Sequence, residues 1–90
     1  MSYEEFLKAV KEDAIKLELN AFDKEEAEKK INDAWADMYE SFGENMCKDQ
    51  YNAIKEAEKK YANGKMSESI YKARVKQNIG MAAWNIWMLA

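Results

Sequence analysis

Apolar residues recur at spacings of three and four along most of this chain, which is the period of an amphipathic helix. The first stripe of such residues consists of Tyr3, Phe6, Leu7, Val10, Ala14 and Leu17. Ser2 precedes this stripe and Glu5 follows Ser2 by three residues, which is the spacing of a capping box at a helix N-terminus. The pattern therefore predicts a first helix over about 2–20.

A second stripe follows, and a glycine marks its end. It consists of Ala27, Ile31, Ala34, Trp35, Met38 and Phe42. Asp23 can cap the start of this stripe, and Gly43 can end it because glycine adopts a positive φ without steric cost. A second helix is predicted over 23–42.

The third stripe is the weakest, because it is rich in alanine and contains a polar residue, Gln50. Its members are Met46, Cys47, Gln50, Ala53, Ile54, Ala57 and Tyr61. The sequence predicts a third helix over 44–62, which ends at Asn63-Gly64, a pair that accepts a left-handed backbone readily.

The last part of the chain carries two apolar stripes on one predicted helix, over 67–89 with Ser67 as its cap. The stripe expected to face the core consists of Tyr71, Val75, Ile79, Ala82, Ile86 and Leu89. The stripe beside it consists of Ile70, Ala73, Met81, Trp84 and Met88, with Trp87 at its flank. The fourth helix is therefore amphipathic at its start and apolar on most sides at its end.

A helix that is apolar on most sides is normally covered on most sides. We expect the fourth helix to be the central helix of the fold, packed by the other three. Two alternatives stay open: a second copy of the chain, or a different protein, covers the outer stripe. Trp84 and Trp87 favour a contact surface, since large aromatic side chains are common at the centre of protein interfaces.

Composition sets the fold class. Ninety residues with no proline and only three glycines exclude a turn-rich β architecture, and an apolar fraction of 48% argues against disorder. Four helices joined by short loops predict an all-α, compact, four-helix bundle-like single domain over 1–90.

Charge is distributed unevenly along the chain. Residues 1–58 carry 16 acidic and 8 basic side chains, whereas residues 59–90 carry one acidic and six basic side chains. The acidic part can offer a negative surface to a basic groove on a partner protein. The candidate residues are Asp33, Asp37, Glu40 and Glu44, together with Glu4, Glu5, Glu12, Asp13 and Glu18. The other interpretation is that these acids keep a small bundle soluble.

The residues for catalysis are scarce. Histidine is absent, and the single cysteine, Cys47, allows neither an intramolecular disulfide nor a thiolate zinc site. Asp33, Asp37 and Glu40 share one side of a helix but lack the dense alternating ligands of a calcium loop. We therefore expect no enzyme activity, no cofactor and no metal site. Cys47 is expected to pack as a small apolar residue, although a place near a helix N-terminus can lower the pKa of a thiol.

The sequence suggests a soluble, cytoplasmic protein without a membrane partner. Acidic residues occupy the N-terminus where a signal peptide has basic ones, and a single cysteine suits a reducing compartment. The apolar segment over 79–90 is shorter than the roughly 20 residues that cross a bilayer.

The leading hypothesis for function is a small, acidic, non-catalytic protein-binding module. It would act as an inhibitor or adaptor, of the kind that phages and other mobile genetic elements carry, by occupying a partner's surface. The apolar binding group would be Met81, Trp84, Trp87 and Met88, or the acidic group would be Asp33, Asp37, Glu40 and Glu44. A homodimer through the fourth helix is also open.

The alternative hypothesis is a small nucleic-acid-binding protein. Residues 59–78 have the outline of a helix-turn-helix, with Lys72, Arg74 and Lys76 on the second helix. The acidic remainder of the chain argues against this alternative, because it would repel the phosphate backbone.

Overall fold

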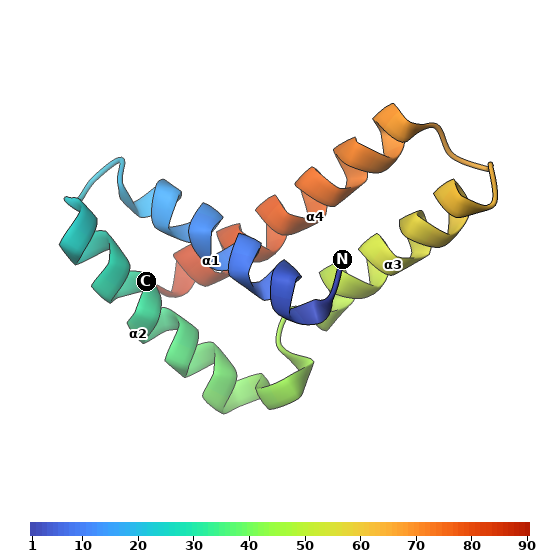
Figure 1. Ribbon diagram of the computed structural model, residues 1–90. Helices are drawn as coiled ribbons and strands as arrows, with labels where there is room; N and C mark the ends of the chain where they lie inside the picture. The colour runs from blue at the N-terminus through green and yellow to red at the C-terminus, as the bar shows by residue number, and fades with distance from the viewer.

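The computed structural model describes all 90 residues, and four α-helices contain most of them (Figure 1). The elements are α1 (Tyr3–Glu18), α2 (Lys24–Phe42), the 3₁₀ turn η1 (Gly43–Asn45), α3 (Lys48–Ala62) and α4 (Glu68–Leu89). There is no β-strand. The predicted all-α, four-helix class is confirmed.

Three of the helices begin at the caps that the sequence predicts. The Ser2 hydroxyl accepts the Glu5 backbone N–H at 3.1 Å, and the Glu5 carboxylate accepts the Ser2 backbone N–H at 3.1 Å. Asp23 and Ser67 accept the backbone N–H three residues later, at 2.9 and 3.3 Å. These bonds satisfy donors that have no partner within the first turn of a helix. The hydrogen bond from the Ser2 backbone N–H, followed by the Ser2 side chain, also lowers the pKa of the Glu5 carboxyl group.

The third helix begins at Lys48, which is later than the predicted start at 44. Gly43, with a φ of +56°, ends α2, and Glu44 lies in η1 instead of in a helix. Cys47 has a φ of +58° and is the only non-glycine residue with a positive φ. The prediction was wrong here because the apolar spacing continues through Met46 and Cys47, whereas the break depends on a backbone conformation that such residues rarely adopt.

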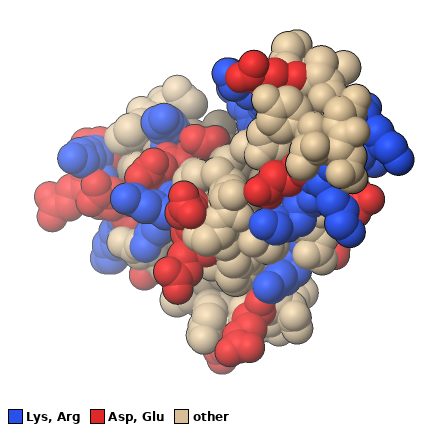
Figure 2. Space-filling model, turned by 45° about the vertical axis from the view of Figure 1, so that its right-hand side comes forward, with Lys and Arg blue, Asp and Glu red and all other residues tan.

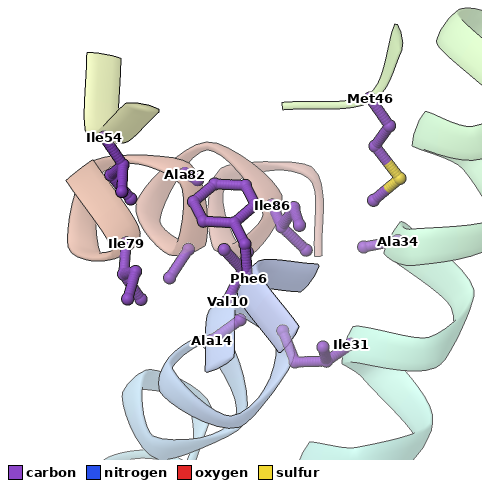
Figure 3. Packing of buried hydrophobic residues seen from close by; sticks show 11 residues of the cluster. Phe6, Val10, Ala14, Ile31, Ala34, Met46, Ile54, Ile79, Ala82 and Ile86 are labelled. Carbon is purple, nitrogen blue, oxygen red and sulfur yellow. The ribbon is translucent and has the colours of Figure 1, made fainter. Parts of the chain in front are cut away.

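Side chains from all four helices and from the turn before α3 form the core (Figure 3). Phe6 is fully buried and points from α1 toward α4. The buried apolar residues are Phe6, Val10, Ala14, Ala27, Ile31, Ala34, Met46, Ile54, Ala57, Ile79, Ala82, Ala83 and Ile86. All but Ala83 lie on the predicted stripes, so helical periodicity located most of the core.

Helix α4 packs against all three other helices, most extensively against α1 and α3. Its predicted core face is buried at Ile79, Ala82 and Ile86. Four residues of the predicted stripes are instead on the surface: Phe42 is 59% exposed, Leu89 53% and Tyr61 39%, and Ala53 is also exposed. Phe42, Tyr61 and Leu89 lie in the last turns of their helices, where the periodic stripe continues but the neighbouring helices cover it less.

The molecule is elongated, with principal dimensions of 43 × 27 × 17 Å. Helices α3 and α4 run antiparallel and side by side, and their connecting turn projects at one end, while α2 lies toward the other end (Figure 1). Near the projecting turn the rings of Tyr61 and Tyr71 stack at 4.9 Å with an interplanar angle of 6°. This aromatic pair holds the two helices together beyond the main core.

Replacing Ile86 or Leu89 with alanine tests which part of the predicted α4 stripe belongs to the core. We expect Ile86→Ala to lower the free energy of unfolding by about 2–5 kcal/mol, because Ile86 is fully buried. Leu89→Ala, at a half-exposed position, should lower it by less than about 1 kcal/mol. Urea unfolding followed by circular dichroism measures both values, and equal losses for the two variants would contradict the assigned burial.

Candidate protein-interaction surface

The face of α4 that points away from the core carries a second row of apolar side chains. Trp84 and Met88 each lie about 160° around the helix axis from the buried Ile86. We call this row the outer seam; it consists of Ile70, Arg74, Gln77, Met81, Trp84 and Met88. Its four apolar members are exposed by 50% at Ile70, 50% at Met81, 51% at Trp84 and 60% at Met88. No other part of the chain covers the outer seam fully, so it is an unpartnered apolar surface.

The structure divides the predicted apolar binding group. Met81, Trp84 and Met88 lie together on the outer seam, whereas Trp87 is half-buried and packs against the core. Trp87 directly precedes Met88, and one residue turns an α-helix by about 100°, so Trp87 points to the side of the outer seam. Trp87 therefore belongs mainly to the fold, and Trp84 is the exposed aromatic residue of this surface.

The exposed surface continues from the outer seam toward the end of α2. Gln77, Gly80, Met81, Trp84 and Asn85 line a shallow depression on α4. Asn85 also lines the neighbouring depression, which includes the exposed Phe42. A Cβ atom at Gly80 would meet no atom within 4 Å, so the helix backbone is open to close approach at this point. Sequence periodicity did not identify Phe42 as a surface residue, because Phe42 continues the apolar stripe of α2. Its position directly before Gly43, at the helix end, was the sequence feature that could have indicated exposure.

The acidic candidates other than Glu18 reach the surface but do not form one row. Asp33, Asp37 and Glu40 are exposed on α2 and make no ion pair. Glu44 is also exposed, but it lies in η1, beyond the end of that helix. Glu18, which was assigned to the acidic surface, is buried, and its Oε2 atom has no hydrogen-bond partner. No group of three or more acidic or cysteine side chains is arranged to hold a metal ion.

The three basic candidates lie on two different sides of α4. Lys72 forms an ion pair with Glu68 at 3.1 Å, and Lys72 and Lys76 line a groove between α1 and α4. Arg74 is on the outer seam and makes no ion pair. Figure 2 shows side chains of both charges interspersed with uncharged surface on one face.

The antiparallel arrangement of α3 and α4 in Figure 1 differs from a helix-turn-helix. In that motif the two helices cross at roughly 90–120°, so that the second can enter a DNA groove. The predicted order of a helix, a turn containing Gly64 and a helix capped by Ser67 is present, but the two helices pack side by side. Nucleic-acid binding by residues 59–78 stays a prediction from the sequence.

Cys47 lies in a packed environment between α2 and α3. Its Sγ atom is 3.9 Å from the Sδ atom of Met38, and burial raises the pKa of the Cys47 thiol to about 11. A nearby hydrogen bond, from the Tyr3 hydroxyl to the Met46 carbonyl, holds the turn before α3. The thiol is therefore neutral at physiological pH, and the lowering of its pKa that a helix N-terminus can cause is not found.

Comparisons with known proteins find no relative of this chain. No protein-family model matches the chain, and no curated protein or solved structure matches it either. Within the chain itself, none of the helices combines the length and apolar character needed to cross a membrane.

The raised pKa of Cys47 predicts slow alkylation. Only the thiolate reacts, so at pH 8 the rate with iodoacetamide should be about 100-fold below that of the urea-unfolded chain, whose thiol has an ordinary pKa near 9.0. The rate in the folded protein should keep rising with pH up to about 11. Mass spectrometry of timed samples measures this reaction, and a rate that levels off below pH 8 would contradict the assigned environment.

Proposed function

We propose that this chain is a non-catalytic protein-binding module that covers the surface of a partner protein with the outer seam of α4. One observation carries the proposal: Met81, Trp84 and Met88 are half-exposed on the face of α4 opposite the core. Contiguous exposed apolar surface on a small soluble domain is typical of an interaction site. Tryptophan and methionine are also enriched where protein surfaces meet.

The energy available from this surface is sufficient for a specific contact. Burial of apolar surface contributes about 25 cal/mol per Å², so completing the burial of each half-exposed seam side chain, on the order of 125 Å², contributes about 3 kcal/mol before the costs of association. Trp84 offers the largest single area, and the shallow depression beside it gives a partner side chain a place to insert. A central aromatic residue with apolar neighbours is the usual arrangement of an interface hot spot.

The exposed acids of α2 support a basic partner. Asp33, Asp37 and Glu40 lack partners within the chain, so their charges are free to attract an oppositely charged surface and to speed association. A domain of this size acts on its partner by steric exclusion. It is an inhibitor where it covers a functional surface of the partner, and an adaptor where it only holds the partner in place.

Capture with matched variants tests this proposal. The full-length chain is immobilised through its N-terminus and incubated with lysate of the source cells, and mass spectrometry identifies the proteins retained. Wild type and Leu19→Ser, a half-exposed residue at the end of α1, should retain the same proteins. Trp84→Ser should lose them while its helical circular dichroism stays unchanged, because Trp84 contributes little to the core.

Trp87→Ser separates a folding effect from a binding effect. Because Trp87 packs against the core, this variant should lower the free energy of unfolding by at least about 2 kcal/mol, whereas Trp84→Ser should change it by less than about 1 kcal/mol. The proposal fails if Trp84→Ser retains every protein that wild type retains, or if Trp84→Ser unfolds the domain.

A further inference from the structure

The outer seam has the spacing of a coiled-coil contact line. Its residues Ile70, Arg74, Gln77, Met81, Trp84 and Met88 are separated alternately by four and three positions. This alternation keeps side chains facing one neighbouring helix, because two helices that wrap slightly around each other repeat every 3.5 residues. From Ile70 to Met88 the seam is about 27 Å long at 1.5 Å per residue. A single helix of similar length, with a matching row, is the partner that fits it.

We infer that this partner is the α4 helix of a second copy of the chain, paired antiparallel about a two-fold axis near Ile79. The inference rests on the proposed function, since it names the occupant of the same surface. The axis places Ile70 opposite Met88 of the second copy, and Gln77 opposite Met81 of the second copy. Arg74 then lies opposite Trp84 of the second copy, where the free guanidinium group can stack on the indole ring.

A parallel pair would be electrostatically unfavourable. It would place Arg74 directly against its own counterpart, and like charges in register oppose association. The antiparallel pair also aligns opposite ends of two charge-asymmetric molecules. The α3–α4 end belongs to a segment, 59–90, with six basic and one acidic side chains, whereas α2 carries six acidic and three basic ones.

Helix α2, which carries the acidic side chains, lies at the opposite end of the molecule from the α3–α4 turn (Figure 1). In Figure 1 the carboxyl end of α4 lies beside α2, and the projecting α3–α4 turn lies at the far end. Turning a second copy end over end therefore brings the basic end of each molecule toward the acidic end of the other. At low ionic strength the exposed acids of α2 in one copy then attract the basic residues near the start of α4 in the other copy.

The size of the surface sets the expected affinity. The half-exposed apolar side chains of the seam present on the order of 500 Å² per copy, so the pair buries roughly 1,000 Å², near the lower limit for a specific interface. The open backbone at Gly80 and the small side chain of Ala73 allow the helices to approach closely. We expect a dimer with a dissociation constant in the micromolar range, on the order of 1–100 μM.

Sedimentation equilibrium of the purified full-length chain, over about 1–200 μM, tests for the second copy. Wild type and Leu19→Ser should show the mass of a dimer at the upper end of this range. Trp84→Ser should raise the dissociation constant at least tenfold, and Arg74→Glu should do the same, because it removes the stacking cation and adds an acid near the acidic α2 of the second copy. Added salt should weaken the wild-type dimer.

Disulfide cross-linking tests the direction of pairing. Two chains are made on a Cys47→Ser background, one with Ile70→Cys and one with Met88→Cys, and their helicity is checked by circular dichroism. An antiparallel pair forms a cross-linked dimer rapidly only when the two chains are mixed. In a parallel pair, two copies of the same variant cross-link without the other variant, because identical residues then lie opposite each other.

The outcomes separate this inference from the proposed function. Three results would overturn the antiparallel pair: a wild-type chain that stays monomeric, a dimer whose dissociation constant does not change with Trp84→Ser, or rapid cross-linking of either cysteine variant alone. A monomeric chain that still captures another protein through Trp84 would overturn the second copy as occupant but leave the proposed function in place. Capture that does not depend on Trp84 would overturn the proposed function itself.

Discussion

One helix with two apolar sides organises this molecule. The inner side of α4 is covered by α1, α2 and α3, and Ile79, Ala82 and Ile86 bury their surface there. The outer side, with Met81, Trp84 and Met88, is left about half-exposed. Apolar burial is the main stabilising term in folding, so contacts with the inner side fix the positions of the other helices. Burial of the outer side by another protein surface would favour association in the same way.

The turn between α2 and α3 sets the direction in which α3 starts. Positive φ angles at Gly43 and Cys47 redirect the chain before α3, and α3 then packs beside α4 (Figure 1). The Tyr3–Met46 hydrogen bond fixes this turn to the start of α1. A continuous helix from Glu44 would start α3 in another direction, so the place of α3 beside α4 depends on a local backbone break as well as on the pattern of apolar residues.

The fold class and most of the core follow from local rules, whereas the site depends on contacts between helices. Caps at Ser2, Asp23 and Ser67 involve residues three positions apart, so the sequence reveals them directly. Periodicity alone shows that two rows on α4 are apolar, and it does not show how far the three other helices reach around that helix. For this reason Trp84 was placed correctly on the outer row, whereas Trp87 was grouped with it although it packs against the core. Glu18 was assigned to the acidic surface, but the structure buries it.

The environment of Trp84 is the most direct test of this account, and its fluorescence reports that environment in a chain carrying Trp35→Phe and Trp87→Phe. In dilute solution we expect the emission maximum of a solvent-exposed indole and ready quenching by acrylamide. As the chain is concentrated, or bound to a captured partner, the emission should shift to the blue and quenching should weaken. Blue emission that resists quenching at the lowest concentration would place Trp84 in the core and contradict the account. Emission that stays red and quenchable under every condition would show that no protein covers the outer seam.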